Sequence, residues 1–134
     1  ATAQNCPDTG EYIPYSSDIV VAGGPVAIDA MSVTLTGVTH TFPSDMDFML
    51  VAPNGDNFII MSDAIGTTGI VALDLTLADF AGADLTGAAA SGTYQPTNNG
   101  AGDVLPGAAP ADQGNTSFTG AFAGDDSPQN TGGE

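Results

Sequence analysis

Hydrophobic and polar residues alternate over several short stretches of this chain, and each stretch predicts a β-strand. Met31, Val33 and Leu35 alternate with serine and threonine, the period-two pattern of a strand with one solvent-facing side. The run 70–77 (IVALDLTL) alternates in the same way, with apolar residues from Val71 onward expected on the inner face. No segment shows convincing helical periodicity, so the pattern favours an all-β fold.

A β-hairpin is predicted in the middle of the chain. The run 48–52 (FMLVA) is apolar on both faces, which suits a strand inside a sandwich. The segment 53–56 (PNGD) has turn chemistry, because proline presets one φ angle and Asn-Gly tolerates positive φ. The run 58–61 (FIIM) then returns as the partner strand.

The remaining apolar runs are shorter. Three further strands are expected, at 18–22 (DIVVA), 92–95 (GTYQ) and 117–122 (SFTGAF). Phe80 is expected to cap the layer formed by 70–77, and the small, turn-rich residues 81–90 allow a short helix. The Gly/Ala/Pro-rich stretch 98–114 indicates a long loop. About seven short strands predict an antiparallel β-sandwich of jelly-roll type.

The chain of 134 residues divides into an N-terminal arm, residues 1–17, and a β-sandwich domain, residues 18–134. The arm is polar and interrupted by proline and glycine. Its Cys6 has no second cysteine to pair with, so it is either a free thiol or bonded to another chain. The start at 1–3 (ATA) suits a mature exported protein, which predicts a secreted or cell-surface location.

The charge of the chain limits the classes of partner that it can bind. The chain has 16 acidic residues, nearly all of them aspartate, and no lysine or arginine, giving a net charge of −16. This composition argues against nucleic acid binding and against adhesion to anionic membranes, because both depend on basic side chains. No apolar run approaches the ~20 residues of a membrane helix. The carboxylates repel one another unless cations from solution intervene.

Calcium is the ligand that this composition favours most. Asp45 and Asp47 lie two apart at the start of the hairpin, and Asp63 lies where the hairpin ends. If the strands pair as predicted, these carboxylates converge at one end, and carboxylate oxygens are preferred Ca²⁺ ligands. The alternative is that they are solvated strand-end aspartates. With a second site in the loops, the candidate metal ligands are Asp45, Asp47, Asp63, Asp103, Asp125 and Asp126.

No catalytic constellation stands out. His40 is the only histidine, and no G-x-S-x-G nucleophile motif is present, so a structural, hydrogen-bonded role is expected for its ring. One histidine and one cysteine make a zinc site improbable. Tyr12, Tyr15 and Tyr94 are either packing residues or a platform for carbohydrate. The protein is therefore predicted not to be an enzyme.

Two spaced motifs resemble a known family. Residues 40–64 (HTFPSDMDFMLVAPNGDNFIIMSDA) contain H-T-[FY]-P-x-D-[LM]-D-[IF], a short turn and a strand closing in S-D, and residues 91–98 (SGTYQPTN) match S-G-T-Y-x-P-x-[ND]. Both resemble the P domain, the β-sandwich module that follows the catalytic domain in subtilisin-like proprotein convertases and many secreted bacterial proteases. The resemblance runs from about residue 18 to the C-terminus and implies calcium binding near Asp45, Asp47 and Asp63.

The end of the chain departs from that family. The family pattern continues into a tryptophan-bearing strand and a closing strand, whereas this chain ends at Glu134 and contains no tryptophan. Either the chain is a fragment of a longer protein, or another subunit supplies the last strands. The sequence thus predicts a jelly-roll sandwich that lacks its last strands.

These features predict a secreted, calcium-stabilised structural module. Its expected role is that of an assembly subunit of a filament or adhesive layer, with other copies of itself or a neighbouring chain as partners. The first alternative is an accessory P domain of a secreted subtilisin-like protease. A carbohydrate-binding module is a second alternative.

Overall fold

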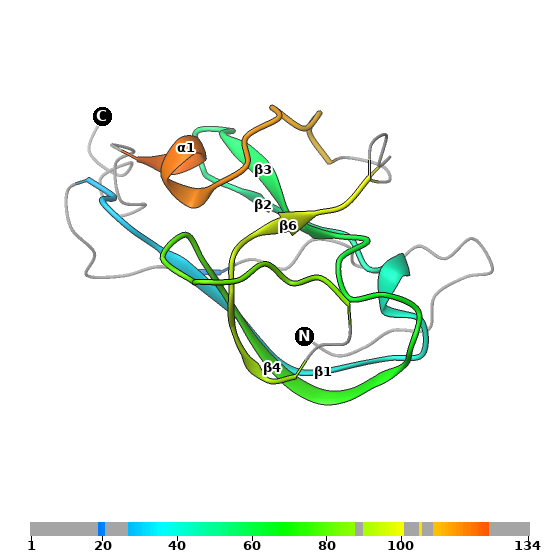
Figure 1. Ribbon diagram of the computed structural model, residues 1–134. Coiled ribbons are helices and arrows are strands. Elements are labelled where there is room, and N and C mark those ends of the chain that lie inside the picture. The colour runs from blue at the N-terminus through cyan, green and yellow to red at the C-terminus, as the bar shows by residue number, and fades with distance from the viewer. Residues whose placement is uncertain (1–18, 21–26, 88–89, 101–104, 106–108, 124–134) are drawn as a thin grey trace.

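The computed structural model describes residues 19–20, 27–87, 90–100, 105 and 109–123. Strands dominate this part of the chain, so the all-β prediction is confirmed (Figure 1). The elements are β1 (Ser32–His40), η1 (Pro43–Asp45), β2 (Phe48–Val51), β3 (Asn57–Ser62), β4 (Ile70–Ala78), β5 (Gly92–Tyr94), β6 (Thr97–Asn98) and α1 (Phe118–Phe122). The predicted arm, 1–17, and most of the predicted strand 18–22 lie outside the described residues. Of the helices described, none is long and apolar enough to cross a membrane.

The strands form two three-stranded sheets, β1-β4-β5 and β2-β3-β6. The pairs β1–β4 and β2–β3 are antiparallel, as predicted, but β4–β5 and β3–β6 are parallel. The chain returns after β4 to place β5 parallel to it, and then, after Gln95 and Pro96, joins the other sheet as β6 beside β3 (Figure 1). The sheets are therefore mixed, and the prediction of a purely antiparallel architecture is wrong.

β2 and β3 form the predicted hairpin. Phe48 lies opposite Met61 and Leu50 opposite Phe58. Gly55 in the connecting turn has a φ of 96°, which glycine adopts without steric cost. β3 is buried at every position: β2 pairs along one edge, β6 pairs with Met61 and Ser62 on the other, and the segment 113–115 hydrogen-bonds to Asn57.

One hydrophobic core joins the two sheets and α1. The ring of Phe58 lies at its centre, 5.2 Å from the ring of Phe118 in a T-shaped arrangement and 5.7 Å from the ring of Phe122. Leu75 and Leu77 of β4 are fully buried in the same cluster. The core therefore depends on contacts between segments that are far apart in the sequence.

Residues 118–122 form helix α1, so the prediction of a strand at 117–122 is wrong. Phe118 and Phe122 lie four residues apart, and this spacing places them on the same side of a strand and of a helix alike. Ser117 favours the helix, because its Oγ accepts a hydrogen bond from the Gly120 N–H at 2.9 Å.

Asp79, which follows β4, holds the first turn of α1. Its Oδ1 accepts a hydrogen bond from the Phe118 N–H at 2.8 Å. Its Oδ2 accepts from the Thr119 N–H at 2.7 Å and from the Thr119 hydroxyl at 2.6 Å. Burial acts to raise the pKa of Asp79, but the hydrogen bonds from Thr119 and Phe118 outweigh burial and leave the pKa below its ordinary value.

We expect Asp79→Asn to lower the free energy of unfolding at neutral pH by about 1–2 kcal/mol. The amide offers one acceptor oxygen in place of two, and its NH₂ group faces N–H donors. Because the folded-state pKa is lowered, the carboxylate stabilises the fold above the ordinary value of 3.8. This stabilisation is lost as the pH falls through the folded-state pKa. Urea unfolding of both proteins should show their difference shrinking with acid, and a difference independent of pH would contradict this role.

A β-bulge interrupts β1. Between the pairs Leu35–Leu75 and Val38–Leu73, two residues of β1 oppose Asp74 alone. Gly37 in this bulge has a φ of 65°, and its N–H donates to Asp74 Oδ1 at 2.8 Å. The bulge ends the regular pairing of β1 with β4 at Leu35.

A second irregularity lies in β4 and reverses one prediction. Ala72 has a φ of 52° and donates its N–H to Thr39 Oγ1 at 2.9 Å. The extra residue shifts the alternation, so that Ile70 is buried and Val71, expected on the inner face, is 76% exposed. Phe80 is 77% exposed, and the expectation that it caps the layer is wrong as well.

Thr97 secures the segment that crosses between the sheets. Its hydroxyl accepts a hydrogen bond from the Leu85 N–H at 2.8 Å and donates to the Gln95 carbonyl oxygen at 2.8 Å. We expect Thr97→Val to lower the free energy of unfolding by about 1–3 kcal/mol, because the buried Leu85 N–H loses its acceptor. Thr93→Val, at an exposed position of β5, should change it by less than about 0.5 kcal/mol. Equal effects of the two substitutions in urea unfolding would rule out this role for Thr97.

Candidate functional site

Three of the candidate calcium ligands, Asp45, Asp47 and Asp63, lie around one end of the β2-β3-β6 sheet. Phe48 pairs with Met61, which places Asp47 beside Ser62. The buried Ser62 Oγ donates a hydrogen bond to Asp47 Oδ1 at 2.7 Å. Asp63 follows Ser62 directly, so the hairpin carries Asp47 and Asp63 at the same end.

Asp45 reaches this end through η1. The Ser44 N–H donates to the Gly66 carbonyl oxygen at 3.0 Å, which ties η1 to the loop after β3. The Asp45 N–H donates to the Phe42 carbonyl oxygen at 3.0 Å and closes the turn, while Asp45 itself is exposed. The three aspartates thus sit on two segments that hydrogen bonds hold together.

A third segment, after β6, contacts Asp63. The Asn99 N–H donates to the Ser62 carbonyl oxygen at 3.0 Å, and the Asn99 side chain reaches the Asp63 carbonyl oxygen at 3.4 Å. Asp63 has a φ of 49°, a left-handed conformation that aspartate tolerates better than most residues. A Cβ on Gly100 would lie 3.2 Å from Asp63 Oδ2, so glycine leaves room for this carboxylate.

The donor chemistry of this end fits calcium in part. Calcium takes six to eight oxygen ligands, from carboxylates, backbone carbonyls and water. Among the described residues, no three His, Cys, Asp or Glu side chains are grouped so as to hold a metal. A site at this end would therefore use at most two of the carboxylates of Asp45, Asp47 and Asp63 together, with backbone oxygens and water as its other ligands. The remaining candidates, Asp103, Asp125 and Asp126, lie outside the described residues.

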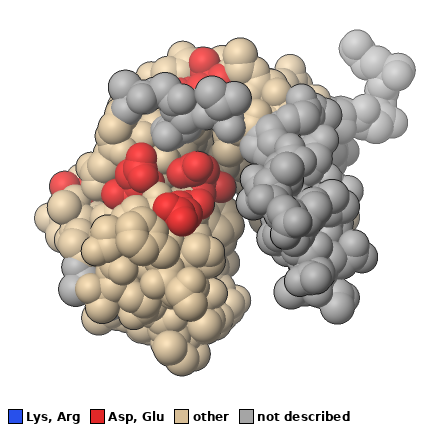
Figure 2. Space-filling view, turned by 90° about the vertical axis from the view of Figure 1, so that its right-hand side faces the viewer, with Lys and Arg blue, Asp and Glu red and all other residues tan. Residues whose placement is uncertain are grey.

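Acidic side chains gather on one side of the molecule. Figure 2 views the side that carries η1 in Figure 1 and shows a group of acidic side chains near its centre. The sequence has no lysine or arginine to offset them. Clustered carboxylates create a negative potential that concentrates cations from solution.

His40 lies at the end of β1 and is hydrogen-bonded, as expected. Its Nδ1 accepts a hydrogen bond from the Phe42 N–H at 3.1 Å. A neutral ring with an acceptor at Nδ1 carries its proton on Nε2. The contact helps to shape the turn between β1 and η1.

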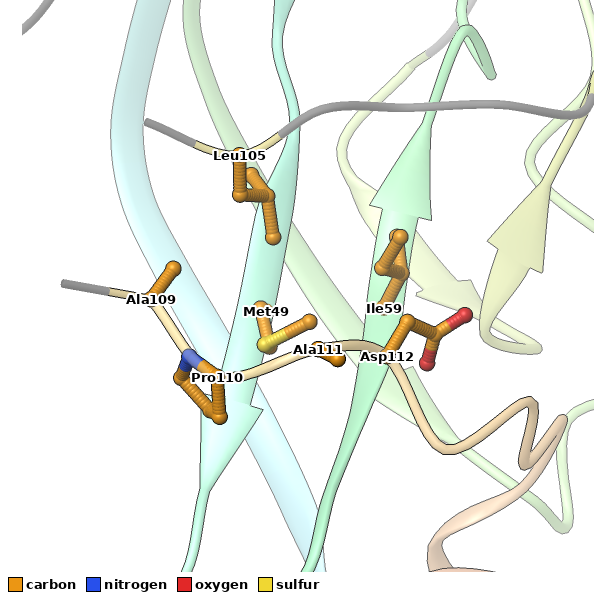
Figure 3. A pocket seen from close by; sticks show the side chains of 7 residues that line it. All are labelled: Met49, Ile59, Leu105, Ala109, Pro110, Ala111 and Asp112. Atoms are coloured by element: carbon orange, nitrogen blue, oxygen red, sulfur yellow. The ribbon is translucent and has the colours of Figure 1, made fainter. Parts of the chain in front are cut away.

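A pocket of about 290 Å³ lies over the outer face of the β2–β3 hairpin (Figure 3). Met49 and Ile59 line it from the strands, and Asp112 is the one charged residue among the described lining residues. These residues are Met49, Ile59, Leu105, Ala109, Pro110, Ala111 and Asp112. The volume is at the lower limit of ligand sites, and the described lining is mostly apolar, with no pair of groups for acid–base chemistry.

Tyr94 does not present its ring as a free platform. It packs against the core, and its hydroxyl donates to the Ala90 carbonyl oxygen at 2.8 Å. Tyr12 and Tyr15, the other two tyrosines considered for carbohydrate binding, lie outside the described residues. The packing interpretation therefore holds for Tyr94.

Two polar residues that organise the fold were missed by the sequence analysis. Asp79 binds the start of α1, 39 residues later in the chain. Asn57 binds Gln113, 56 residues later. No local pattern signals either contact, although an aspartate shortly after an amphipathic strand is a common cap for a neighbouring turn.

Comparison with known proteins identifies no relative. No protein-family model, no curated protein and no solved structure matches the chain. The resemblance to the P domain therefore depends on the two quoted motifs alone and stays a prediction.

Proposed function

We propose that the chain is a non-catalytic, calcium-stabilised extracellular module, a β-sandwich of jelly-roll type that serves as a structural subunit of a filament or adhesive layer. The observation that carries the proposal is the open edge of β1. In the part of the chain that the structure describes, this strand of nine residues pairs only with β4, and its other edge carries no strand. Unpaired N–H and C=O groups along an edge are a template for a strand from another chain.

The other outer strands are less suited to this role. Among the described strands, β5 has three residues and β6 has two. β2 has four residues and is preceded directly by Asp47. β1 is longer and contains no proline and no acidic or basic residue apart from His40 at its end. Charges and proline are the usual protections of an edge strand, so β1 is the best-suited surface for strand addition.

Calcium supports the assembly in two ways. Bound near Asp45, Asp47 and Asp63, it would offset part of the net charge of −16, which opposes contact between subunits. It would also fix η1, which follows the end of β1 after Thr41 and Phe42. The candidate metal end therefore directly follows the C-terminal end of β1 in the chain.

We expect millimolar calcium to raise the melting temperature. At 1 mM Ca²⁺ and a Kd of ~0.1 mM, one site contributes about 1.4 kcal/mol, or roughly 5 °C for a domain of this size. Asp63→Asn should remove most of this gain, and Asp47→Asn should reduce it while keeping an acceptor for Ser62. Differential scanning calorimetry measures the calcium-induced shift of each protein.

The matched control is Asp29→Asn, which removes the same charge before β1, at the opposite end of that strand from η1. Its calcium-induced shift should equal that of the unaltered protein. Magnesium should give a smaller shift, because it demands a tighter octahedral geometry. A shift that is the same for all variants would show general screening of charge rather than a site at this end.

Assembly itself is tested by sedimentation velocity of the full chain over a range of protein concentrations, with calcium and with a chelator. The proposal predicts larger species that grow with concentration in calcium and dissociate on chelation. A monomer at every concentration in both buffers would contradict assembly. That outcome, with a retained calcium shift, would favour the accessory-domain alternative instead.

A further inference from the structure

We propose that the strand bound at the β1 edge is β1 of a second copy of this chain, paired antiparallel about a two-fold axis at Thr34. This inference rests on the proposed function and specifies its partner. In this arrangement Ser32 lies opposite Thr36 of the partner subunit, and Val33 lies opposite Leu35 of the partner subunit. The β1-β4-β5 sheets of the two copies then join into one continuous sheet of six strands.

Charge argues for a second copy of β1 as the occupant. Residues 32–36 contain no acidic side chain, in a chain of net charge −16. Two copies can therefore pair along this strand without placing carboxylates of the paired segments opposite one another. A basic partner would instead be attracted to the carboxylates on the side shown in Figure 2.

The bulge in β1 selects the register. Regular pairing with β4 extends through Leu35, and the bulge at Gly37 turns the edge away after Thr36. An antiparallel pair centred on Thr34 uses Ser32–Thr36 from each copy and leaves Gly37, the bulge residue with a positive φ, outside the contact. This centre brings every residue of the regular segment Ser32–Leu35 into the contact.

Side-chain alternation supports the same register. Val33 and Leu35 are half-buried and pack on the core, whereas Ser32, Thr34 and Thr36 are exposed. Centring on Thr34 places apolar residues opposite apolar residues and hydroxyls opposite hydroxyls. A shift by one residue would oppose Thr34 to an inward-facing position and break this match.

A row of threonine hydroxyls already crosses the sheet and would continue through the contact. Thr34 Oγ1 and Thr76 Oγ1 are hydrogen-bonded at 3.0 Å, and Thr76 pairs in register with Thr93 of β5. Opposed threonines stabilise neighbouring strands by cross-strand contacts. Pairing of Thr34 with Thr34 of the partner subunit joins the two rows.

A cysteine placed at the two-fold axis tests the inference. In a Cys6→Ser background, Thr34→Cys places two thiols directly opposite, where Cα atoms about 4.5–5.5 Å apart allow a disulfide. Thr93→Cys is the control, since it is exposed in the same sheet and lies roughly 24 Å from its copy across five strand spacings. Under mild oxidation in calcium, Thr34→Cys should form disulfide dimers at least about tenfold faster than Thr93→Cys.

A second pair of variants tests the register. Ser32→Cys and Thr36→Cys, each in the Cys6→Ser background, should cross-link efficiently when mixed and poorly when oxidised alone. Equal cross-linking rates for Thr34→Cys and Thr93→Cys, or efficient self-cross-linking of Ser32→Cys, would overturn the proposed pairing. If sedimentation still shows calcium-dependent assembly in that case, the assembly proposal stands and only the β1 contact is wrong.

Discussion

Phe58→Ala is expected to lower the free energy of unfolding by about 3–5 kcal/mol, the usual cost of emptying a large aromatic site in a core. Phe58 is fully buried, and its ring contacts those of Phe118 and Phe122. The substitution leaves a cavity and also removes the surface on which α1 packs. A helix of five residues has too few hydrogen bonds to form without tertiary contacts.

This loss is a large share of the 5–15 kcal/mol that typically stabilises a folded domain. Phe80→Ala is the matched control, because it deletes the same atoms from a side chain that is 77% exposed. We expect it to change stability by less than about 0.5 kcal/mol. Urea unfolding followed by far-UV circular dichroism compares the two. Similar losses for both variants would show that the core is not centred on Phe58.

Asn57→Asp is expected to cost about 3 kcal/mol at neutral pH, although the two side chains have nearly the same shape. Asn57 is 1% exposed. Its Nδ2 donates to the Gly55 carbonyl oxygen at 3.1 Å, and its Oδ1 accepts from the Gln113 N–H at 3.3 Å. A carboxylate would oppose the Gly55 oxygen with negative charge in a buried place.

The neighbouring contacts make Asn57 the anchor of the segment 113–115. The Asn57 N–H donates to Gln113 Oε1 at 3.0 Å, and Asn115 Nδ2 donates to the Asn57 carbonyl oxygen at 3.2 Å. The substitution therefore also weakens the hydrogen bonds between β3 and the segment that leads into α1. The loss of stability should be detected as a lower urea concentration at the midpoint of unfolding.

The pH dependence of this variant provides an internal check. Burial raises the pKa of the introduced carboxyl group, so it destabilises the fold most above that pKa, and the cost falls as acid protonates it. Asn98→Asp adds the same charge at an exposed position of β6 and should show little effect at either pH. An unaltered stability of Asn57→Asp at neutral pH would contradict the buried network.

The sequence pattern predicts those strands whose structure is set locally. Alternation places the strands at 32–36 and 73–77, and the turn residues at 53–56 fix the β2–β3 hairpin. Val71 does not face inward, because Ala72 adopts a positive φ. Alanine rarely adopts this conformation, so the sequence gives no sign of it. The parallel pairings of β5 and β6 were also missed, since they depend on a crossing between sheets rather than on a local pattern.

The candidate site likewise combines features that the sequence predicts with features that it does not. Asp47 and Asp63 lie at one end because hairpin register brings residues before and after it together. The approach of Asn99 and Gly100 to Asp63 depends on the parallel pairing of β6 with β3, which the sequence does not reveal. Sequence reasoning therefore identifies carboxylates but cannot supply the backbone oxygens that would complete a calcium site.

The central claim, that the open edge of β1 becomes paired when the protein assembles, is tested most directly by hydrogen exchange of β1 amides. Mass spectrometry of a peptide covering Ser32–His40 is compared at low and high protein concentration in calcium, and again with a chelator. A peptide from β3, which has strands on both edges, serves as the internal reference. The account predicts that protection of β1 rises with concentration, only in calcium, while protection of β3 stays constant. Protection of β1 that is the same under all these conditions would contradict the account.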